Sequence, residues 1–110
     1  MQINKTRQND MVICSITGDI DINSSPDIRK NLDELTGKQE KKIVLDLDNV
    51  SYIDSSGLAT LVEMLKKTRK YGGKLRLSNL ADKVKSLFEI TKLDKLFEIY
   101  ETSEQAKANF

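Results

Sequence analysis

Four consecutive residues near the middle of the chain, Asp54-Ser55-Ser56-Gly57, place a carboxylate beside two hydroxyl groups. A serine hydroxyl can accept a phosphoryl group from a kinase, and a neighbouring carboxylate can assist the proton transfer. At a helix start the same hydroxyl groups can cap free backbone N–H groups, and those N–H groups can also hold an anion. These residue types therefore leave both helix capping and phosphate chemistry open for Ser55 and Ser56.

Two further carboxylates, Asp19 and Asp21, follow Gly18 in a predicted turn. We expect them to gather with Asp54 at the end of the sheet where the strand-to-helix loops emerge. There they can contact a partner or position the serine, but Asp is also common in turns because it bonds nearby backbone N–H groups. We favour the turn role for Asp19, whereas both roles remain open for Asp21 and Asp54.

The composition excludes several other kinds of site. The chain has no histidine and one cysteine, Cys14, so the usual zinc ligand sets and the Ser-His and Cys-His catalytic pairs are absent. Carboxylate-based magnesium sites and phosphoryl transfer are not excluded. We interpret Asp46 and Asp48 as a solvated strand end rather than a metal pair, and Gly72-Gly73-Lys74 as a helix stop rather than a phosphate loop.

The charge balance gives no reason to expect a nucleic-acid or membrane partner. The 18 basic and 17 acidic residues leave a formal net charge of +1. The basic cluster between Lys66 and Arg76 has no interleaved aromatic residues, so we predict a solvated face there. No apolar run reaches the roughly 20 residues that span a bilayer, and the first ten residues lack the apolar core of a signal peptide. We therefore expect a cytoplasmic protein.

The central serines lie between a predicted strand and a predicted helix. The strand is a short apolar run from Ile43 to Leu47. The helix is predicted from about Ser56 to Tyr71 and ends at Gly72-Gly73. Its apolar positions follow helical spacing and are predicted to be buried, namely Leu58, Leu61, Val62 and Leu65. Other residues of the same helix are expected to be exposed and to contact a partner, namely Thr60, Glu63 and Met64.

The flanking segments complete an α/β fold. The chain opens with a hairpin of Gln2–Thr6 and Met11–Thr17, which places Cys14 on a strand as a small buried residue. The next element is a helix that Ser24 or Ser25 caps and Gly37 ends, and the central strand and helix follow it. After them come a strand Lys74–Ser78 and a helix Asp82–Thr91, with Val84, Leu87, Phe88 and Ile90 buried. The last elements are a strand Leu96–Tyr100 and a helix capped by Ser103. Together they predict one domain of residues 1–110, a mixed sheet of four or five strands opened by the hairpin and covered by about four helices.

Three segments resemble those of a known family. Tyr52-Ile53-Asp54-Ser55-Ser56-Gly57-Leu58, after an apolar strand and at the start of an amphipathic helix, resembles the signature of STAS domains, specifically bacterial anti-sigma factor antagonists. The segment 17–21 resembles the family's Gly-acidic-x-Asp turn, and the segment 86–97 resembles its late helix-to-strand region. The matches occur in the right order, and the resemblance covers nearly the whole chain.

The resemblance implies a STAS-type sandwich and a non-enzymatic switch. In this family the unphosphorylated protein binds an anti-sigma factor that is commonly also a serine kinase, and so releases a sigma factor for transcription. Phosphorylation of Ser55 ends the association, Ser56 is then the helix cap, and a separate phosphatase restores binding. ATP and magnesium are used by the partner kinase, so we expect no cofactor or metal on this chain. The surface implied for the partner comprises Asp19, Asp21, Asp54, Ser55, Ser56, Gly57, Thr60, Glu63 and Met64.

Three alternatives stay open at this point. A soluble STAS accessory subunit of a transporter or lipid-asymmetry system shares the fold, but such modules often lack an intact Asp54-Ser55-Ser56 motif. A nucleotide-binding protein or enzyme has no phosphate loop, histidine or cysteine pair to support it, and measurable ATP or GTP turnover would favour it. A receiver domain phosphorylated on Asp46 or Asp48 conflicts with the opening hairpin.

Overall fold

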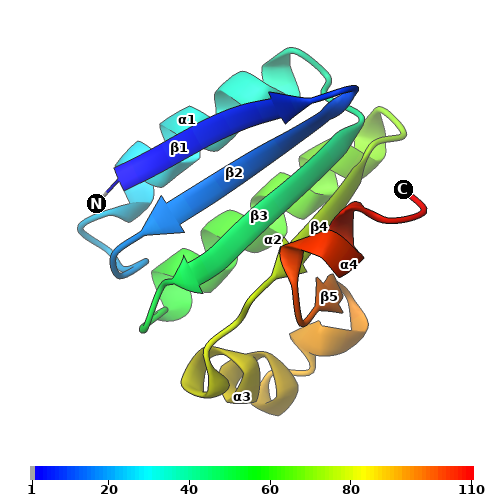
Figure 1. Cartoon of the computed structure of the whole chain (residues 1–110). Coiled ribbons are helices and arrows are strands. Elements are labelled where there is room, and N and C mark those ends of the chain that lie inside the picture. The colour runs from blue at the N-terminus through cyan, green and yellow to red at the C-terminus, as the bar shows by residue number, and fades with distance from the viewer. Residues whose placement is uncertain (1) are drawn as a thin grey trace.

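The computed structural model describes residues 2–110, in which every predicted helix and strand is present close to its predicted bounds. Figure 1 shows their arrangement. Along the chain the elements are β1 (Gln2–Gln8), β2 (Met11–Thr17), α1 (Ser25–Gly37), β3 (Lys42–Asn49), α2 (Ser55–Lys70), β4 (Lys74–Ser78), α3 (Asp82–Ile90), the short 3-10 helix η1 (Leu93–Lys95), β5 (Glu98–Tyr100) and α4 (Ser103–Lys107).

The five strands form one mixed sheet in the order β1-β2-β3-β4-β5. β1 and β2 are antiparallel and pair from Gln2 opposite Thr17 to Gln8 opposite Met11, which confirms the predicted opening hairpin. β2, β3, β4 and β5 run parallel to one another. Their carboxyl ends therefore share one end of the sheet, where the loops to α1, α2 and α3 emerge.

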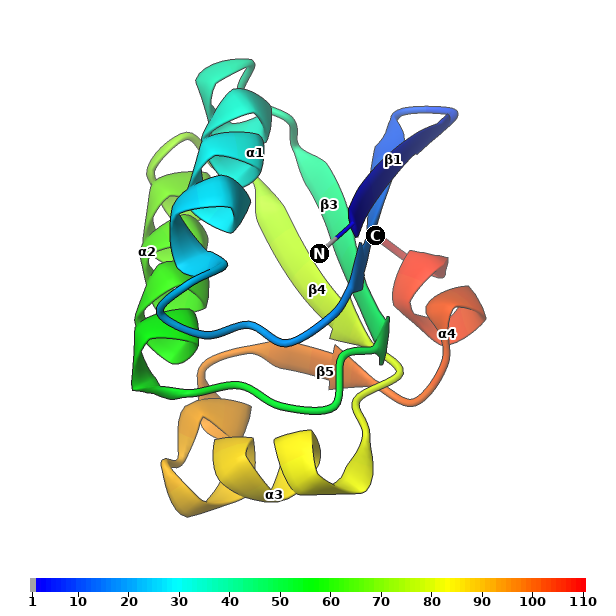
Figure 2. The same ribbon diagram turned by 90° about the vertical axis from the view of Figure 1, so that its left-hand side faces the viewer.

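The helices cover the sheet unequally. In Figure 2, α1 and α2 lie side by side against one face, whereas the short α4 lies on the opposite face. α3 lies at the end of the sheet below β5. The arrangement confirms the predicted α/β sandwich, but only two of the four helices make a full covering layer.

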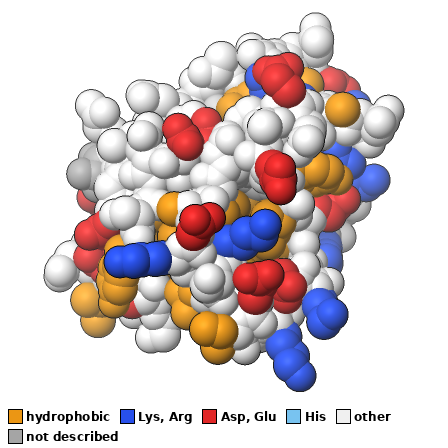
Figure 3. All heavy atoms as spheres, turned by 60° about the horizontal axis from the view of Figure 1, so that its bottom comes forward, with side chains coloured by type: hydrophobic (Ala, Val, Ile, Leu, Met, Phe, Trp, Pro, Cys, Tyr) orange, Lys and Arg blue, Asp and Glu red, His pale blue; other side chains and the backbone are white. Residues whose placement is uncertain are grey.

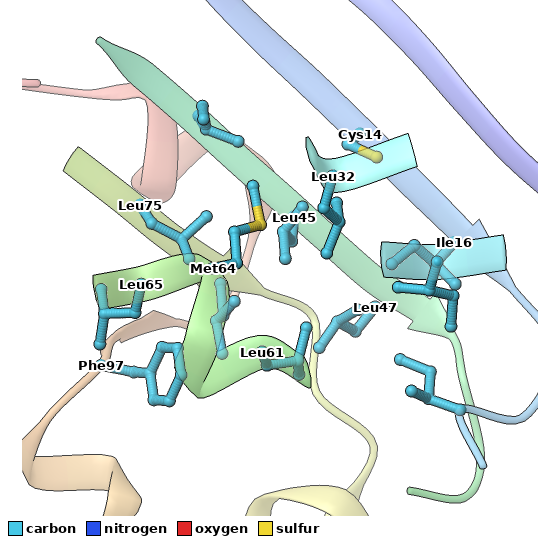
Figure 4. Close-up of a cluster of buried hydrophobic side chains, with 14 of the residues drawn as sticks. Cys14, Ile16, Leu32, Leu45, Leu47, Leu61, Met64, Leu65, Leu75 and Phe97 are labelled. Carbon is cyan, nitrogen blue, oxygen red and sulfur yellow. The ribbon is translucent and has the colours of Figure 1, made fainter. Parts of the chain in front are cut away.

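The main core lies between the sheet and the α1–α2 layer. Alternate residues of β2 and β3 point into this layer, because successive side chains of a strand face opposite sides. Figure 4 shows part of the cluster, in which Cys14, Ile16, Leu45 and Leu47 of the strands face Leu61 of α2. Cys14 is fully buried as predicted, and burial raises the pKa of its thiol to about 11.

The buried face of α2 differs from the prediction. Leu58 and Val62 are only half-buried, whereas Thr60 and Met64 are 2% and 3% exposed. The helix packs against α1 as well as the sheet, so its buried face is rotated by about one residue from the predicted stripe. Thr60 is tolerated there because its hydroxyl donates to the Ser56 carbonyl at 3.0 Å.

Two further burial predictions are wrong. Ile90, predicted to be buried, is 78% exposed because it is the last residue of a helix that lies at the edge of the molecule. Arg76, predicted on a solvated basic face, is 4% exposed on β4. It is buried because the C-terminal segment folds over it, and its guanidinium donates to the carbonyls of Ala106, Ala108 and Asn109.

Candidate functional site

Two loops meet at the carboxyl end of the sheet. One connects β2 to α1 and the other connects β3 to α2. The Ile20 N–H donates to the Tyr52 carbonyl at 2.9 Å, and the Asp54 N–H donates to the Ile20 carbonyl at 3.0 Å. This bridge between Ile20 and Ile53 continues the parallel pairing of β2 and β3 beyond the strands. The start of α2 is therefore held at a fixed position beside the first loop.

Asp54 caps α2 and joins the two loops. One carboxylate oxygen accepts from the Gly57 N–H at 2.9 Å, and the other accepts from the Ile22 N–H at 3.0 Å. The prediction that Ser56 is the cap is wrong. Asp and Ser are both favoured at this position, and the extended backbone at Asp54 is the one that directs a side chain toward the first turn.

Ser55 is consequently not needed as a cap. It is the first residue of α2 and is exposed, whereas Ser56 is half-buried. Within residues 2–110, no hydrogen bond engages the Ser55 hydroxyl. The hydroxyl stands at the positive end of the helix dipole, beside backbone N–H groups that have no partner within the helix. Chemically, this position offers a nucleophilic hydroxyl and a place where added negative charge is tolerated.

Gly57 allows the two loops to approach each other closely. A Cβ atom at this position would lie 2.5 Å from the Ile20 carbonyl oxygen and 2.9 Å from the Cγ2 of Ile53. Gly57 is buried, so little of its surface is available for the predicted partner contact. Its role is to let the Ile20 backbone pack on the first turn of α2.

The three carboxylates gather at this end of the sheet as predicted, and each takes part in loop structure. The Asp21 carboxylate accepts from the N–H groups of Asn23 and Ser24 at 2.9 and 3.1 Å, an Asx-type turn. The Asp19 carboxylate accepts from the Ser51 hydroxyl at 3.2 Å, and Asp19 is exposed. Turn formation therefore accounts for the local bonds of Asp21, while Asp19 ties the two loops together.

The predicted contact residues of α2 divide into two groups. Thr60 and Met64 face the core, so the prediction that they are exposed for a partner is wrong. The side chain of Glu63 is 42% exposed and forms an ion pair with Arg29 of α1 at 2.9 Å. Of these three residues, Glu63 alone remains accessible.

Two exposed apolar residues beside Ser55 were not predicted. Ile22 is 69% exposed and Tyr52 is 54% exposed, and both belong to the two loops that meet there. Figure 3, which brings this end of the molecule forward, shows hydrophobic side chains at the surface among acidic and basic ones. An apolar residue between the polar residues Asp21 and Asn23, outside any helical or strand period, was the available signal for Ile22. Exposed apolar side chains next to a free hydroxyl suit a protein-binding surface.

Neither a cluster of metal-ligating side chains nor a membrane-spanning helix occurs in the described part of the chain. Among residues 2–110, no three metal-ligating side chains lie close enough to hold an ion. Asp46 accepts from the Asp48 N–H and from the Asn79 side chain, which fits the interpretation of a strand end. In the same described part of the chain, none of the helices combines the length and apolar character of a membrane span.

Comparisons with known proteins agree over nearly the whole chain. A family model described as the STAS domain matches residues 2–106. An anti-sigma-B factor antagonist from Bacillus subtilis is 38% identical over 91% of this chain and 90% of its own length. The corresponding protein from Listeria monocytogenes is 32% identical over 96% and 92%. A crystal structure of a candidate anti-sigma factor antagonist from Thermotoga maritima has a TM-score of 0.90 and 30% identity, covering 94% of this chain and 90% of that one.

Proposed function

The chain belongs to the STAS domain family, and we propose that it is an anti-sigma factor antagonist that binds its anti-sigma factor while Ser55 is unphosphorylated. The family resemblance recognised in residues 52–58 is confirmed. Proteins of this kind regulate by binding, and this chain acts in the same way rather than as an enzyme. Sequestering the anti-sigma factor releases a sigma factor for transcription in the cytoplasm.

The main support for the proposal is that Asp54, and not Ser55, makes the hydrogen bonds that shape the site. Asp54 caps the helix and holds the Ile22 loop, so the Ser55 hydroxyl is exposed and takes no part in either contact. A modification of Ser55 therefore leaves the bonds that shape the site intact. This is the property required of a residue that switches binding without unfolding the domain.

Phosphorylation of Ser55 changes the charge of the surface more than its shape. A phosphate adds about −1.5 to −2 charges and three acceptor oxygens. It stands beside Asp54 on a surface that also carries Asp21, and the helix N-terminus stabilises it in place. A partner surface that fits a neutral hydroxyl then meets added bulk and repulsive charge, so binding is lost while the fold is kept.

The chemistry of the switch resides in the partners. The anti-sigma factor is also the serine kinase and uses ATP and magnesium, while this chain is its substrate and binds neither. A phosphatase removes the phosphate and restores binding. The residues that contact the anti-sigma factor are the exposed or half-exposed ones of this surface, namely Asp19, Asp21, Ile22, Tyr52, Asp54, Ser55, Ser56 and Glu63.

The test compares two variants of Ser55 that differ only in charge. Isothermal titration calorimetry with the purified anti-sigma factors of the genome that encodes this chain measures their affinities, and circular dichroism checks the fold. We expect Ser55→Asp to bind at least about tenfold more weakly than Ser55→Asn, because the carboxylate alone adds the repulsive charge. Equal affinities of the two variants, or no binding by the wild-type chain, contradict the proposal.

A further inference from the structure

The outward face of α2 continues the Ser55 surface along the helix. Ser55, Ala59, Val62, Lys66 and Lys70 follow the spacing of one helical face, opposite the buried residues. A shallow groove of about 540 Å³ lies on this side of the helix. We name it the α2 groove, and its lining residues are Ala59, Val62, Glu63, Lys66, Lys67 and Lys70.

The floor of the α2 groove is apolar. Ala59 is exposed and Val62 is half-buried, so both present methyl groups to the groove. The aliphatic stems of the lysines extend this surface, because a lysine keeps its ammonium in water while its methylene chain lies along apolar atoms. An apolar side chain of a partner can therefore be buried between the first two turns and the lysines.

The charged groups of the α2 groove are unevenly paired. The Lys67 ammonium lies 2.8 Å from Asp33 and 3.8 Å from Glu63, and Glu63 is also paired with Arg29. Within residues 2–110, Lys66 and Lys70 form no ion pair. Two cations that no carboxylate of the described chain neutralises therefore border the far end of the groove.

We propose that the α2 groove receives a segment of the anti-sigma factor that combines apolar side chains with carboxylates, the apolar groups meeting Ala59 and Val62 and the carboxylates meeting Lys66 and Lys70. This inference rests on the proposed function and names the chemistry of the partner surface. Two features select this occupant, namely the unpaired positive charge and the continuity of the groove with Ser55 on one helical face. Complementary charge of this kind favours binding and fixes the orientation of the partner.

Ser55 at one end of this surface and Lys66 and Lys70 at the other act on the partner independently. Lys66 lies 11 residues after Ser55, so the helical rise separates them by about 16 Å. Charges farther apart than the Debye length of about 8 Å are largely screened at physiological salt. A phosphate on Ser55 therefore acts on the partner near the helix start, while the lysines contribute affinity at the other end.

The test reverses the two unpaired charges and compares a matched control. We expect Lys66→Glu/Lys70→Glu to weaken binding of the purified anti-sigma factor by about tenfold or more and to reduce its salt dependence. The control Lys83→Glu/Lys95→Glu makes the same change of net charge at two exposed lysines of α3 and η1, and we expect an affinity within about twofold of the wild type. Circular dichroism and the unfolding midpoint check both folds.

A second variant tests the apolar floor without changing charge. Ala59→Gln adds a bulky neutral side chain at an exposed helix position, so it should fill the groove and weaken binding while leaving the fold unchanged. If binding by the wild type is sensitive to Ser55→Asp but both groove variants bind normally, the groove inference is wrong and the proposed function stands. If the wild type binds no anti-sigma factor, both are wrong. If Lys66→Glu/Lys70→Glu and the control Lys83→Glu/Lys95→Glu weaken binding equally, the effect is one of net charge and the groove is not the docking site.

Discussion

The start of α2 and the C-terminal segment are each held by hydrogen bonds between one charged side chain and backbone groups. The two contacts differ in which residues they leave exposed. At the start of α2, the Asp54 carboxylate accepts from backbone N–H groups of two separate segments. At the C-terminal segment, the Arg76 guanidinium donates to three backbone carbonyls, one in the last turn of α4 and two just after it. In each case one charged side chain fixes chain segments that are distant in sequence.

The two regions differ in what they leave at the surface. The Arg76 guanidinium lies over the rings of Tyr100 and Phe110, 5.2 and 4.2 Å from their centres, and is buried there. Asp54 is half-buried and leaves Ser55 and Ile22 exposed beside it. The C-terminal contact stabilises the fold, whereas the Asp54 contact shapes a surface and leaves the Ser55 hydroxyl free.

The largest expected effect follows from removing Arg76. Arg76→Ala leaves three carbonyl groups without their donor and removes the contact with both rings, so we expect a loss of about 3 kcal/mol in the free energy of unfolding. Urea denaturation measures it. The control Arg29→Ala, which breaks an exposed ion pair, should cost less than about 1 kcal/mol. Similar values for the two variants would show that the C-terminal contact adds little stability.

Gly57→Ala should have the next largest effect. The added methyl group overlaps the Ile20 carbonyl, and we expect a loss of about 2 kcal/mol after any gain in helix propensity. Gly37→Ala is the matched control, because a Cβ there meets no atom within 4 Å. It should leave the free energy of unfolding unchanged or slightly raised. Equal behaviour of the two variants would contradict the close approach of the loops.

Asp54→Ala should have a smaller effect on stability and a specific effect on binding. Losing the cap costs about 1 kcal/mol in the free energy of unfolding. The Ile22 loop also loses its bond to α2, so affinity for the anti-sigma factor should fall more than stability does. Asp54→Asn keeps a side-chain acceptor, so its stability and affinity should lie between those of the wild type and Asp54→Ala. A stable Asp54→Ala variant with unchanged affinity would show that the loop needs no anchor.

Ser55→Ala should have the smallest effect on stability. The hydroxyl is exposed and unbonded within the described chain, so the free energy of unfolding should change by less than about 0.5 kcal/mol. The same variant should still bind the anti-sigma factor. A loss of more than about 1 kcal/mol would indicate that Ser55 has a structural role after all.

Much of the fold was predictable from local patterns. The alternation in β2 and the apolar run of β3 predicted their strands, and Gly72, with a φ of 80°, ends α2 as expected. The rotation of α2 was not predictable from apolar residues alone. The hydroxyl groups of two buried threonines, Thr60 and Thr68, donate to carbonyls of the preceding turn. Part of the buried face therefore consists of polar residue types, which a search for apolar residues does not find.

The location of the site was predictable from the sequence, but the roles of its individual residues were less so. Asp54, Ser55 and Ser56 are all residue types that can cap a helix, and only the backbone conformation selects Asp54. Arg76 was assigned to the surface because it follows a run of basic residues, whereas its burial depends on a segment 30 residues later in the chain. Such long-range contacts leave no local pattern in the sequence.

The proposed role of Ser55 as the phosphorylated residue depends on Asp54 being the cap of α2. The most direct measurement is mass-spectrometric mapping of the phosphate after incubation with the purified anti-sigma factor kinase, ATP and magnesium. The wild-type chain and Ser56→Ala should each carry one phosphate on Ser55, and Ser55→Ala should carry none. Phosphate on Ser56 in the wild type, or undiminished incorporation in Ser55→Ala, would contradict the account.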